Sequence, residues 1–219
     1  MALPSNKLIT INDRGARTAT TFGSLSQGGA NMVFIKKLTA SSSGTLSFVD
    51  GADSVVLDST YKEYVFTFKN IHIQTDGAEG PGFQADTGTN TNYNQPITST
   101  FFESLHRQDD VVTNLRYSTA GSDQAQGTAF QRLAFSLDAS QASDNFCGTL
   151  KIFNPSSDTF VKHFTGTFQY THDGDGDEQY SFNTFVAGYF NQTTPLTRFQ
   201  FKMESGNIDS GDICLYGIL

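Results

Sequence analysis

The sequence predicts an all-β protein, an antiparallel β-sandwich of jelly-roll-like type with an extended N-terminal arm. Apolar side chains recur at every second position, and clusters of turn-forming residues separate these runs. The composition agrees, because the 219 residues include 20 Gly, 20 Phe and 8 Tyr while only 16% are charged. A chain of this length can bury one core between two facing sheets.

Residues 1–31 differ from the rest of the chain. Ser, Thr, Asn, Gly and Gln dominate there, and apolar residues are sparse. A segment of this composition buries too little apolar surface to fold alone. We therefore expect an arm over residues 1–31, which makes an attachment or oligomer contact, and a β-sandwich domain over residues 32–219.

Period-two alternation marks the expected strands in order along the chain. The side chains expected to face inward are Tyr64, Phe66 and Phe68, then Leu133, Phe135 and Leu137, then Leu150 and Ile152, then Phe160, Phe164, Phe168 and Tyr170, and finally Phe199, Phe201 and Met203. Lys162 is the odd member of its run. Residues 101–108 fit a helical turn or an edge strand. The last run, DICLYGIL, is typical of a strand buried on both faces or at an assembly contact.

Charge and hydropathy narrow the classes of partner. The chain has 14 Lys and Arg against 22 Asp and Glu, a net charge of -8, which disfavours nucleic acid and anionic lipid. No apolar run reaches the roughly 18 residues that a membrane helix needs, so we expect no membrane insertion. Cys147 and Cys214 lie in strand-like runs, which favours small buried thiols and leaves their pairing open.

An acidic stretch, THDGDGDEQY, covers residues 171–180. A calcium loop of the EF-hand type needs a glycine at its sixth position and an acidic residue at its twelfth. Counted from Asp173, these positions are Glu178 and Thr184. We interpret the stretch as a solvated hairpin tip. The alternative is weak calcium binding by Asp173, Asp175 and Asp177, and we expect no other cofactor.

The common catalytic motifs are missing from the sequence. It contains no nucleophile elbow of the G-x-S-x-G type, no phosphate-binding P-loop and no H-E-x-x-H zinc motif. We therefore expect no enzyme. Glycoside hydrolysis remains an alternative, because it needs only two carboxylates that the fold brings together.

Aromatic residues in polar surroundings are the better indication of binding. Tyr93, Tyr117, Tyr180 and Tyr189 lie beside Asn, Gln, Asp or Ser. Planar rings stack on the faces of sugars while amides and hydroxyls bond the sugar hydroxyls. These four residues are candidates for glycan binding, and the alternative for each ring is a core edge or a subunit contact.

Five segments carry a resemblance to a known group of proteins. They are LDSTYKEYVFTFKNIH, FQADTGTNTNYN, GTLKIFNPSSDTFVKHFTG, FVAGYFN and FKMESGNIDSGDICLYGI. Through them the chain resembles small β-sandwich proteins encoded among the structural genes of tailed bacteriophages, especially phages from aquatic environments. The group has no defined active site, so the resemblance implies no catalytic residue.

The resemblance implies a structural role in the virion, first as a tail-fibre or receptor-binding tip that contacts host surface polysaccharide. Residues 1–31 would then attach the domain to other virion proteins. It also makes a homo-oligomer the first expectation, and a trimer the first guess. Two alternatives stay open: a capsid or tail decoration protein with a purely architectural role, and a polysaccharide depolymerase.

Overall fold

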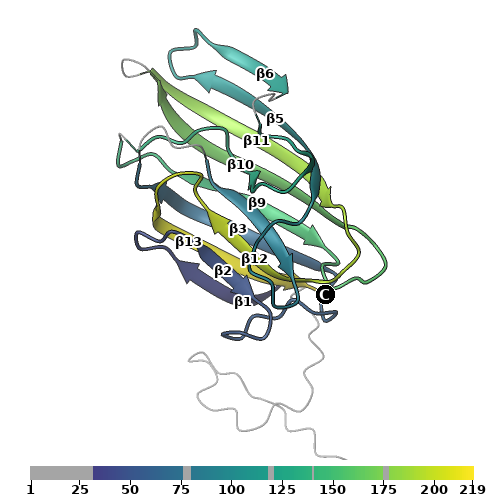
Figure 1. Cartoon of the computed structure of the whole chain (residues 1–219). Helices are drawn as coiled ribbons and strands as arrows, with labels where there is room; N and C mark the ends of the chain where they lie inside the picture. The colour runs from purple at the N-terminus through teal and green to yellow at the C-terminus, as the bar shows by residue number, and fades with distance from the viewer. Residues whose placement is uncertain (1–31, 76–79, 118–120, 140, 175–177) are drawn as a thin grey trace, which may run out of the picture. The chain divides into compact units, whose positions relative to one another are not determined.

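The computed structural model describes residues 32–75, 80–117, 121–139, 141–174 and 178–219 (Figure 1). The expected arm, residues 1–31, lies outside them, as does the middle of the acidic stretch, residues 175–177. No helix occurs in the described part of the chain. That part therefore contains no helix that could cross a membrane.

The described residues form two antiparallel sheets, which confirms the predicted antiparallel β-sandwich. The large sheet follows the order β1-β13-β3-β9-β10-β11-β5-β6, with β7 also paired to β5. Its strands are β1 (Met32–Thr39), β3 (Glu63–Ile73), β5 (Ile97–Arg107), β6 (Thr113–Tyr117), β7 (Ala125–Gly127), β9 (Phe146–Phe153), β10 (Lys162–Gly174), β11 (Glu178–Phe190) and β13 (Ile208–Ile218). The small sheet follows the order β2-β12-β4-β8. It consists of β2 (Leu46–Val49), β4 (Gly82–Thr87), β8 (Gln131–Arg132) and β12 (Leu196–Lys202).

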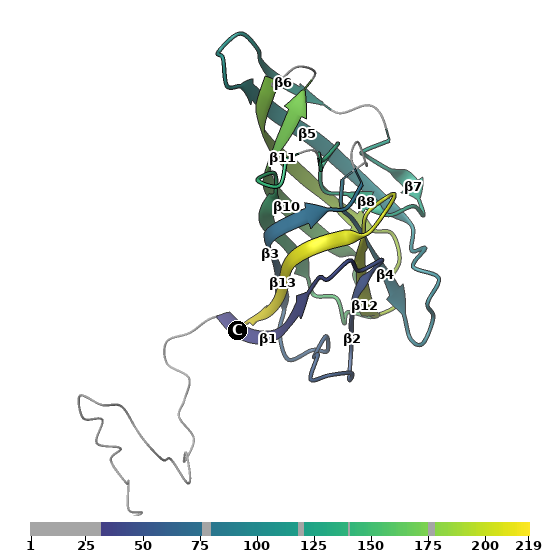
Figure 2. The same cartoon turned by 90° about the vertical axis from the view of Figure 1, so that its left-hand side faces the viewer.

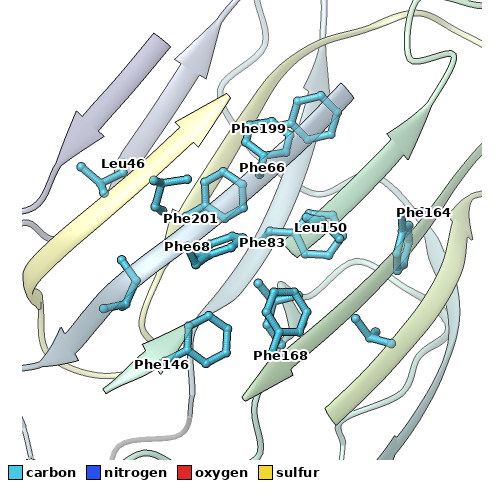
Figure 3. Close-up of a cluster of buried hydrophobic side chains, with 14 of the residues drawn as sticks. Leu46, Phe66, Phe68, Phe83, Phe146, Leu150, Phe164, Phe168, Phe199 and Phe201 are labelled. Atoms are coloured by element: carbon cyan, nitrogen blue, oxygen red, sulfur yellow. The ribbon is translucent and has the colours of Figure 1, made fainter. Parts of the chain in front are cut away.

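The core lies between the sheets and is built largely from phenylalanine rings (Figure 3). Phe66 of β3 is fully buried, and its ring centroid lies 5.2 Å from that of Phe48, 5.5 Å from that of Phe199 and 5.0 Å from that of Phe201. Most of these contacts are edge-to-face, the arrangement that the ring quadrupole favours. The alternation seen in the sequence therefore predicts the inner faces of β3 and β12 correctly.

The two sheets differ in extent. The β5, β6 and β11 end of the large sheet reaches beyond the small sheet (Figure 2). The chain after β8 covers part of its inner face there, because the Thr184 hydroxyl donates a hydrogen bond to the carbonyl of Leu133 at 2.7 Å and the amide of Phe135 donates to the Tyr170 hydroxyl at 3.3 Å.

The strand expected around Leu133, Phe135 and Leu137 is wrong beyond its first residues. Only Gln131–Arg132 pairs with the small sheet, as β8. Leu133 and Leu137 are nevertheless buried, because the segment packs against the large sheet as irregular backbone. Their neighbours Ala134 and Asp138 are buried as well, and Phe135 is only partly buried, so neither the strand nor the expected alternation of burial is correct there.

The start of β10 also differs from expectation. Phe160, expected to face inward, precedes the strand and is 67% exposed. Lys162 is fully buried instead, and its ammonium donates hydrogen bonds to the carbonyls of Thr194 at 2.8 Å and Gln192 at 3.4 Å. These carbonyls compensate part of the desolvation of the ammonium, so that a cation can occupy an apolar face.

The structure answers questions that the sequence left open. Residues 101–108 are neither a helical turn nor an edge strand, because β5 pairs with β11 on one side and with β6 on the other. Cys147 and Cys214 are free thiols, the first partly buried and the second buried. The C-terminal run forms β13, which lies between β1 and β3.

Candidate functional site

The outer face of the large sheet is rich in hydroxyl and amide side chains. Phe164, Phe168 and Tyr170 of β10 point into the core, so the odd-numbered residues between them point outward. Of these outward residues, Thr165, Thr167 and Gln169 are exposed. The Gln169 amide donates a hydrogen bond to the Ser181 hydroxyl of β11 at 2.8 Å, and such groups offer donors and acceptors to a polar ligand.

An aromatic row lies on the same face, formed by Phe185 of β11, Phe102 of β5 and Tyr117 of β6. The three are direct partners in the strand register. The rings of Phe185 and Phe102 are stacked, with centroids 4.9 Å apart and planes at 11°. All three residues are well exposed, at 38%, 40% and 50%. Leu115, also on β6, is 70% exposed beside them.

The aromatic row continues as a row of threonines. Phe185 is the register partner of Thr167, which pairs with Thr149 of β9, which in turn pairs with Thr67 of β3. One line across six neighbouring strands thus begins with exposed rings and continues with the exposed Thr167 and Thr149, while the hydroxyl of Thr67 at its end is buried. Exposed apolar rings on a sheet face are typical of a contact surface, because water solvates them poorly.

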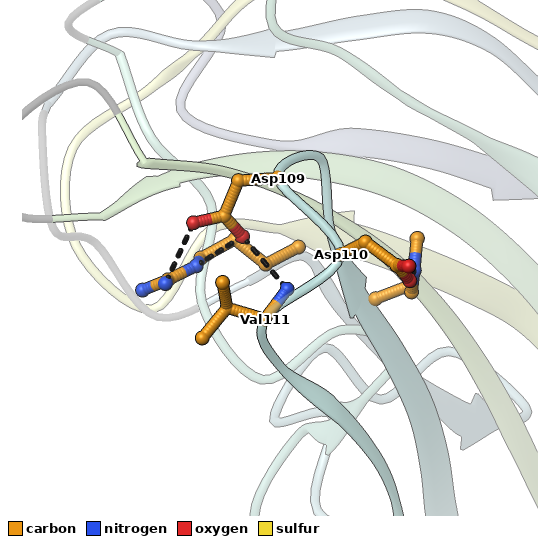
Figure 4. A network of polar contacts seen from close by, with 5 residues as sticks. Asp109, Asp110 and Val111 are labelled. Carbon is orange, nitrogen blue, oxygen red and sulfur yellow. Dashed lines mark hydrogen bonds and ion pairs between the residues drawn. The ribbon is translucent and has the colours of Figure 1, made fainter.

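The turn between β5 and β6 is held by an ionic network (Figure 4). The Arg107 guanidinium donates two hydrogen bonds to the carboxylate of Asp109, both 2.7 Å long, and the amide of Val111 donates a third at 3.0 Å. Asp110, the next turn residue, has a φ of 65°. The bonds from Arg107, and then that from Val111, lower the pKa of Asp109. The network fixes the turn from which β6 leaves, and therefore the place of Tyr117.

An ion pair between a buried carboxylate and a partly exposed guanidinium holds β6 from the inner side. Glu103 of β5 is fully buried, and the Arg116 side chain of β6 approaches its Oε1 with Nε at 2.7 Å and Nη2 at 2.6 Å. The guanidinium lies 5.8 Å from the centroid of the Phe135 ring. Burial raises the pKa of Tyr170 nearby, and the negative charge of Glu103 raises it further. The pair attaches the edge strand β6 to β5 on the face of the sheet opposite the aromatic row.

The four tyrosines singled out in the sequence do not form one site. Tyr117 belongs to the aromatic row, and its hydroxyl donates to Asp123 at 2.7 Å; this bond raises the pKa of Tyr117. Tyr189 lies on β11 with its ring centroid 5.9 Å from that of His163. Tyr93 is 8% exposed, and Tyr180 packs against the core.

The side chains of Asp173, Asp175 and Asp177 lie outside the described residues. The backbone of Asp173 belongs to β10 and pairs with Gln179 of β11, so the acidic stretch joins two neighbouring strands. In the part of the chain that the structure describes, no group of three or more His, Cys, Asp or Glu side chains is placed to hold a metal ion.

Phe102 and Phe185 supply two of the three rings of the aromatic row, and neither was among the site residues predicted from the sequence. A signal was present. Phe101 and Phe102 are adjacent, and Phe182 and Phe185 are three positions apart. In a strand such pairs cannot share a face. One ring of each pair must therefore point away from the core.

No protein-family model, no curated protein and no solved structure matches this chain. The geometry of the outer face and the resemblance in its sequence are therefore what a functional proposal can rest on.

Proposed function

We propose that the chain is a structural protein of a phage virion, a tail-fibre or receptor-binding tip that holds host surface polysaccharide on the outer face of its large sheet. The aromatic row beside the threonine row is the observation that carries the proposal. The apolar faces of sugar rings stack on exposed aromatic rings, while sugar hydroxyls exchange hydrogen bonds with threonine and amide groups.

The shape of the face suits a polymer. Neighbouring strands are about 4.8 Å apart, so the line of exposed side chains from Tyr117 to Thr149 crosses about 19 Å of sheet. A polysaccharide lying across the strands can contact several binding groups at once. Each contact is weak, and a homo-oligomer, in this proposal a trimer, adds affinity because further sites bind intramolecularly. In this proposal residues 1–31 attach the domain to other virion proteins.

A second candidate function, the architectural decoration protein, is favoured by a different surface. Met32 and Phe34 of the edge strand β1 are 42% and 56% exposed. Phe34 lies against Tyr216 of β13, with ring centroids 5.6 Å apart. An exposed apolar patch on an edge strand is typical of protein contact. In this reading the patch, and not the aromatic row, makes the functional contact.

Retention of the purified full chain on a panel of immobilised bacterial surface polysaccharides tests the proposal. We expect at least one polysaccharide to retain the wild type, and Phe102→Ser combined with Phe185→Ser to weaken that retention about tenfold, because two stacking contacts are lost. Phe160→Ser is the control, since it removes an even more exposed phenylalanine ring outside the aromatic row.

Two further assays, binding to stripped virions and release of reducing ends, separate the rival functions. Loss of binding to stripped virions on Phe34→Ser, with no polysaccharide retained, would favour the decoration protein. Release of new reducing ends from a retained polysaccharide would identify a depolymerase.

A further inference from the structure

A hollow of about 310 Å³ opens on the small sheet. Its lining includes Gly82 of β4, Arg132 of β8, Lys202 of β12 and, from neighbouring loops, Phe130 and Glu204. This volume is at the lower end of the range for small-molecule sites, so the hollow suits a ligand the size of one sugar unit.

The strand register explains the hollow. Lys202 pairs with Gly82, and Gly82 pairs with Arg132, so a glycine separates two long cationic side chains on one face of the sheet. The neighbouring Phe201 and Phe83 are buried in the core, which turns this row outward. A Cβ on Gly82 would lie 3.2 Å from the Cβ of Phe130, so the glycine leaves the floor open.

Positive charge lines the hollow although the chain carries a net charge of -8. The Lys202 ammonium lies 4.6 Å from the centroid of the Phe130 ring, a cation–π contact that holds it in place. Within the described residues Lys202 forms no ion pair. Arg132 binds the carboxylate of Glu204 at 2.9 Å, and the side chains of the two are 14% and 54% exposed. The Arg132 guanidinium is therefore already paired with the Glu204 carboxylate at the edge of the hollow.

We propose that this hollow binds a sugar carboxylate, that is, one hexuronic acid unit of an acidic polysaccharide. The carboxylate accepts hydrogen bonds from the Lys202 ammonium, and the sugar ring lies over Gly82 beside Phe130. Charge-assisted bonds of this kind are the strong ones. The inference rests on the proposed function for the choice of a sugar, but it concerns the opposite sheet from the aromatic row.

Titration of the full-length protein with D-glucuronate, followed through its backbone amide resonances, tests the inference. We expect shifts centred on Gly82, Arg132 and Lys202. In Lys202→Gln we expect about tenfold weaker binding, because an ionic hydrogen bond is lost. Lys62→Gln removes the same charge from an exposed position just before β3 and should bind like the wild type.

Two control ligands and one control variant test which parts of the ligand and of the hollow are needed for binding. D-Glucose should bind at least about tenfold more weakly than glucuronate, since it lacks the carboxylate. Acetate should also bind more weakly, since it lacks the ring. Gly82→Ala should reduce glucuronate binding by narrowing the floor.

Equal affinity for glucose and glucuronate would show that binding does not require the carboxylate. Equal affinity for acetate and glucuronate would show that binding does not require the sugar ring. Either result would overturn the proposed ligand. Shifts in the wild type away from Gly82, or none at millimolar ligand, would overturn the site. If polysaccharide retention still depends on Phe102 and Phe185 in that event, this inference fails alone. If glucuronate binds at Gly82 while no polysaccharide is retained through the aromatic row, the proposed function fails and the assignment of the hollow as a glucuronate site is kept.

Discussion

Among single residues, Glu103 and Arg116 make a side-chain contact that joins the edge strand β6 to β5. Arg116 binds one carboxylate oxygen of the fully buried Glu103, while the other oxygen, Oε2, has no hydrogen-bond partner among the described residues. Removing the guanidinium would leave a buried charge without compensation. We expect Arg116→Met to lower the free energy of unfolding by about 3 kcal/mol, measured by urea denaturation at neutral pH.

The double variant Glu103→Leu with Arg116→Met is the control for this prediction. It removes both charges and leaves apolar groups, so its stability should return to within about 1 kcal/mol of the wild type. A double variant as unstable as Arg116→Met would contradict the account, because the loss would then come from packing.

Lys162 predicts a pH dependence of stability. Burial lowers its pKa to about 8 in the folded protein, although the charge of Asp158 opposes the shift; in an unfolded chain a lysine has a pKa of about 10.4. Between these values the unfolded state binds more protons than the folded state, so the free energy of unfolding contributed by this group rises with pH.

The measurement is the difference in unfolding free energy between the wild type and Lys162→Met across this pH window. We expect the difference to grow in favour of the wild type from about pH 8 to about pH 10. Tyrosines that ionise at high pH affect both proteins alike. A difference that is constant or falls with pH would show that Lys162 is not held in an environment that disfavours its charge.

How far single residues can be predicted from sequence differs across the chain. Phe66, Phe68, Phe199 and Phe201 follow the alternation and are buried as expected. Lys162 breaks its run, yet only the carbonyls of a loop some thirty residues later explain its burial. Such partners depend on tertiary structure and leave no local signal.

Among the elements, the β5–β6 hairpin determines where the aromatic row ends. Asp109 accepts hydrogen bonds from the Arg107 side chain and from the amide of Val111. We expect Asp109→Asn to accelerate amide hydrogen exchange in β6, because the turn loses its ionic bonds. Exchange in β3, at the other side of the sheet, should not change.

Acidification should reproduce this effect in the wild type. Arg107 holds the pKa of Asp109 below its ordinary value, so the stabilisation is present above the unfolded pKa of about 3.9 and is lost as the pH falls through the lowered folded-state value. Protection of β6 that is equal in wild type and Asp109→Asn at neutral pH would contradict a role for the carboxylate.

Alternation predicts the long strands well and the short ones poorly. β3 and β12 appear where the pattern places them, whereas the run around Leu133, Phe135 and Leu137 forms only the two-residue β8. The small sheet ends there, and the chain packs on the large sheet as largely irregular backbone. The residue types alternate regularly there although the segment also buries Ala134 and Asp138, so the sequence pattern could not show where the strand ends.

For the whole molecule, the sequence was sufficient to predict two facing antiparallel sheets but not their unequal extent. The aromatic row joins Phe102, Tyr117 and Phe185, which come from three strands, and only the register brings them together. A shift of one residue would turn each ring to the opposite face. Sequence patterns fix which residues alternate, but not which strands become neighbours, so the binding face could not be located in advance.

Amide hydrogen exchange of the full chain, with and without a polysaccharide that retains it, tests the central claim most directly. The account predicts slower exchange in β5, β6 and β11 around Phe102, Tyr117 and Phe185 when the polysaccharide is present. Protection confined to β1 and β13, or no protection at saturating polysaccharide, would contradict the assignment of the outer face of the large sheet as the surface that binds the host.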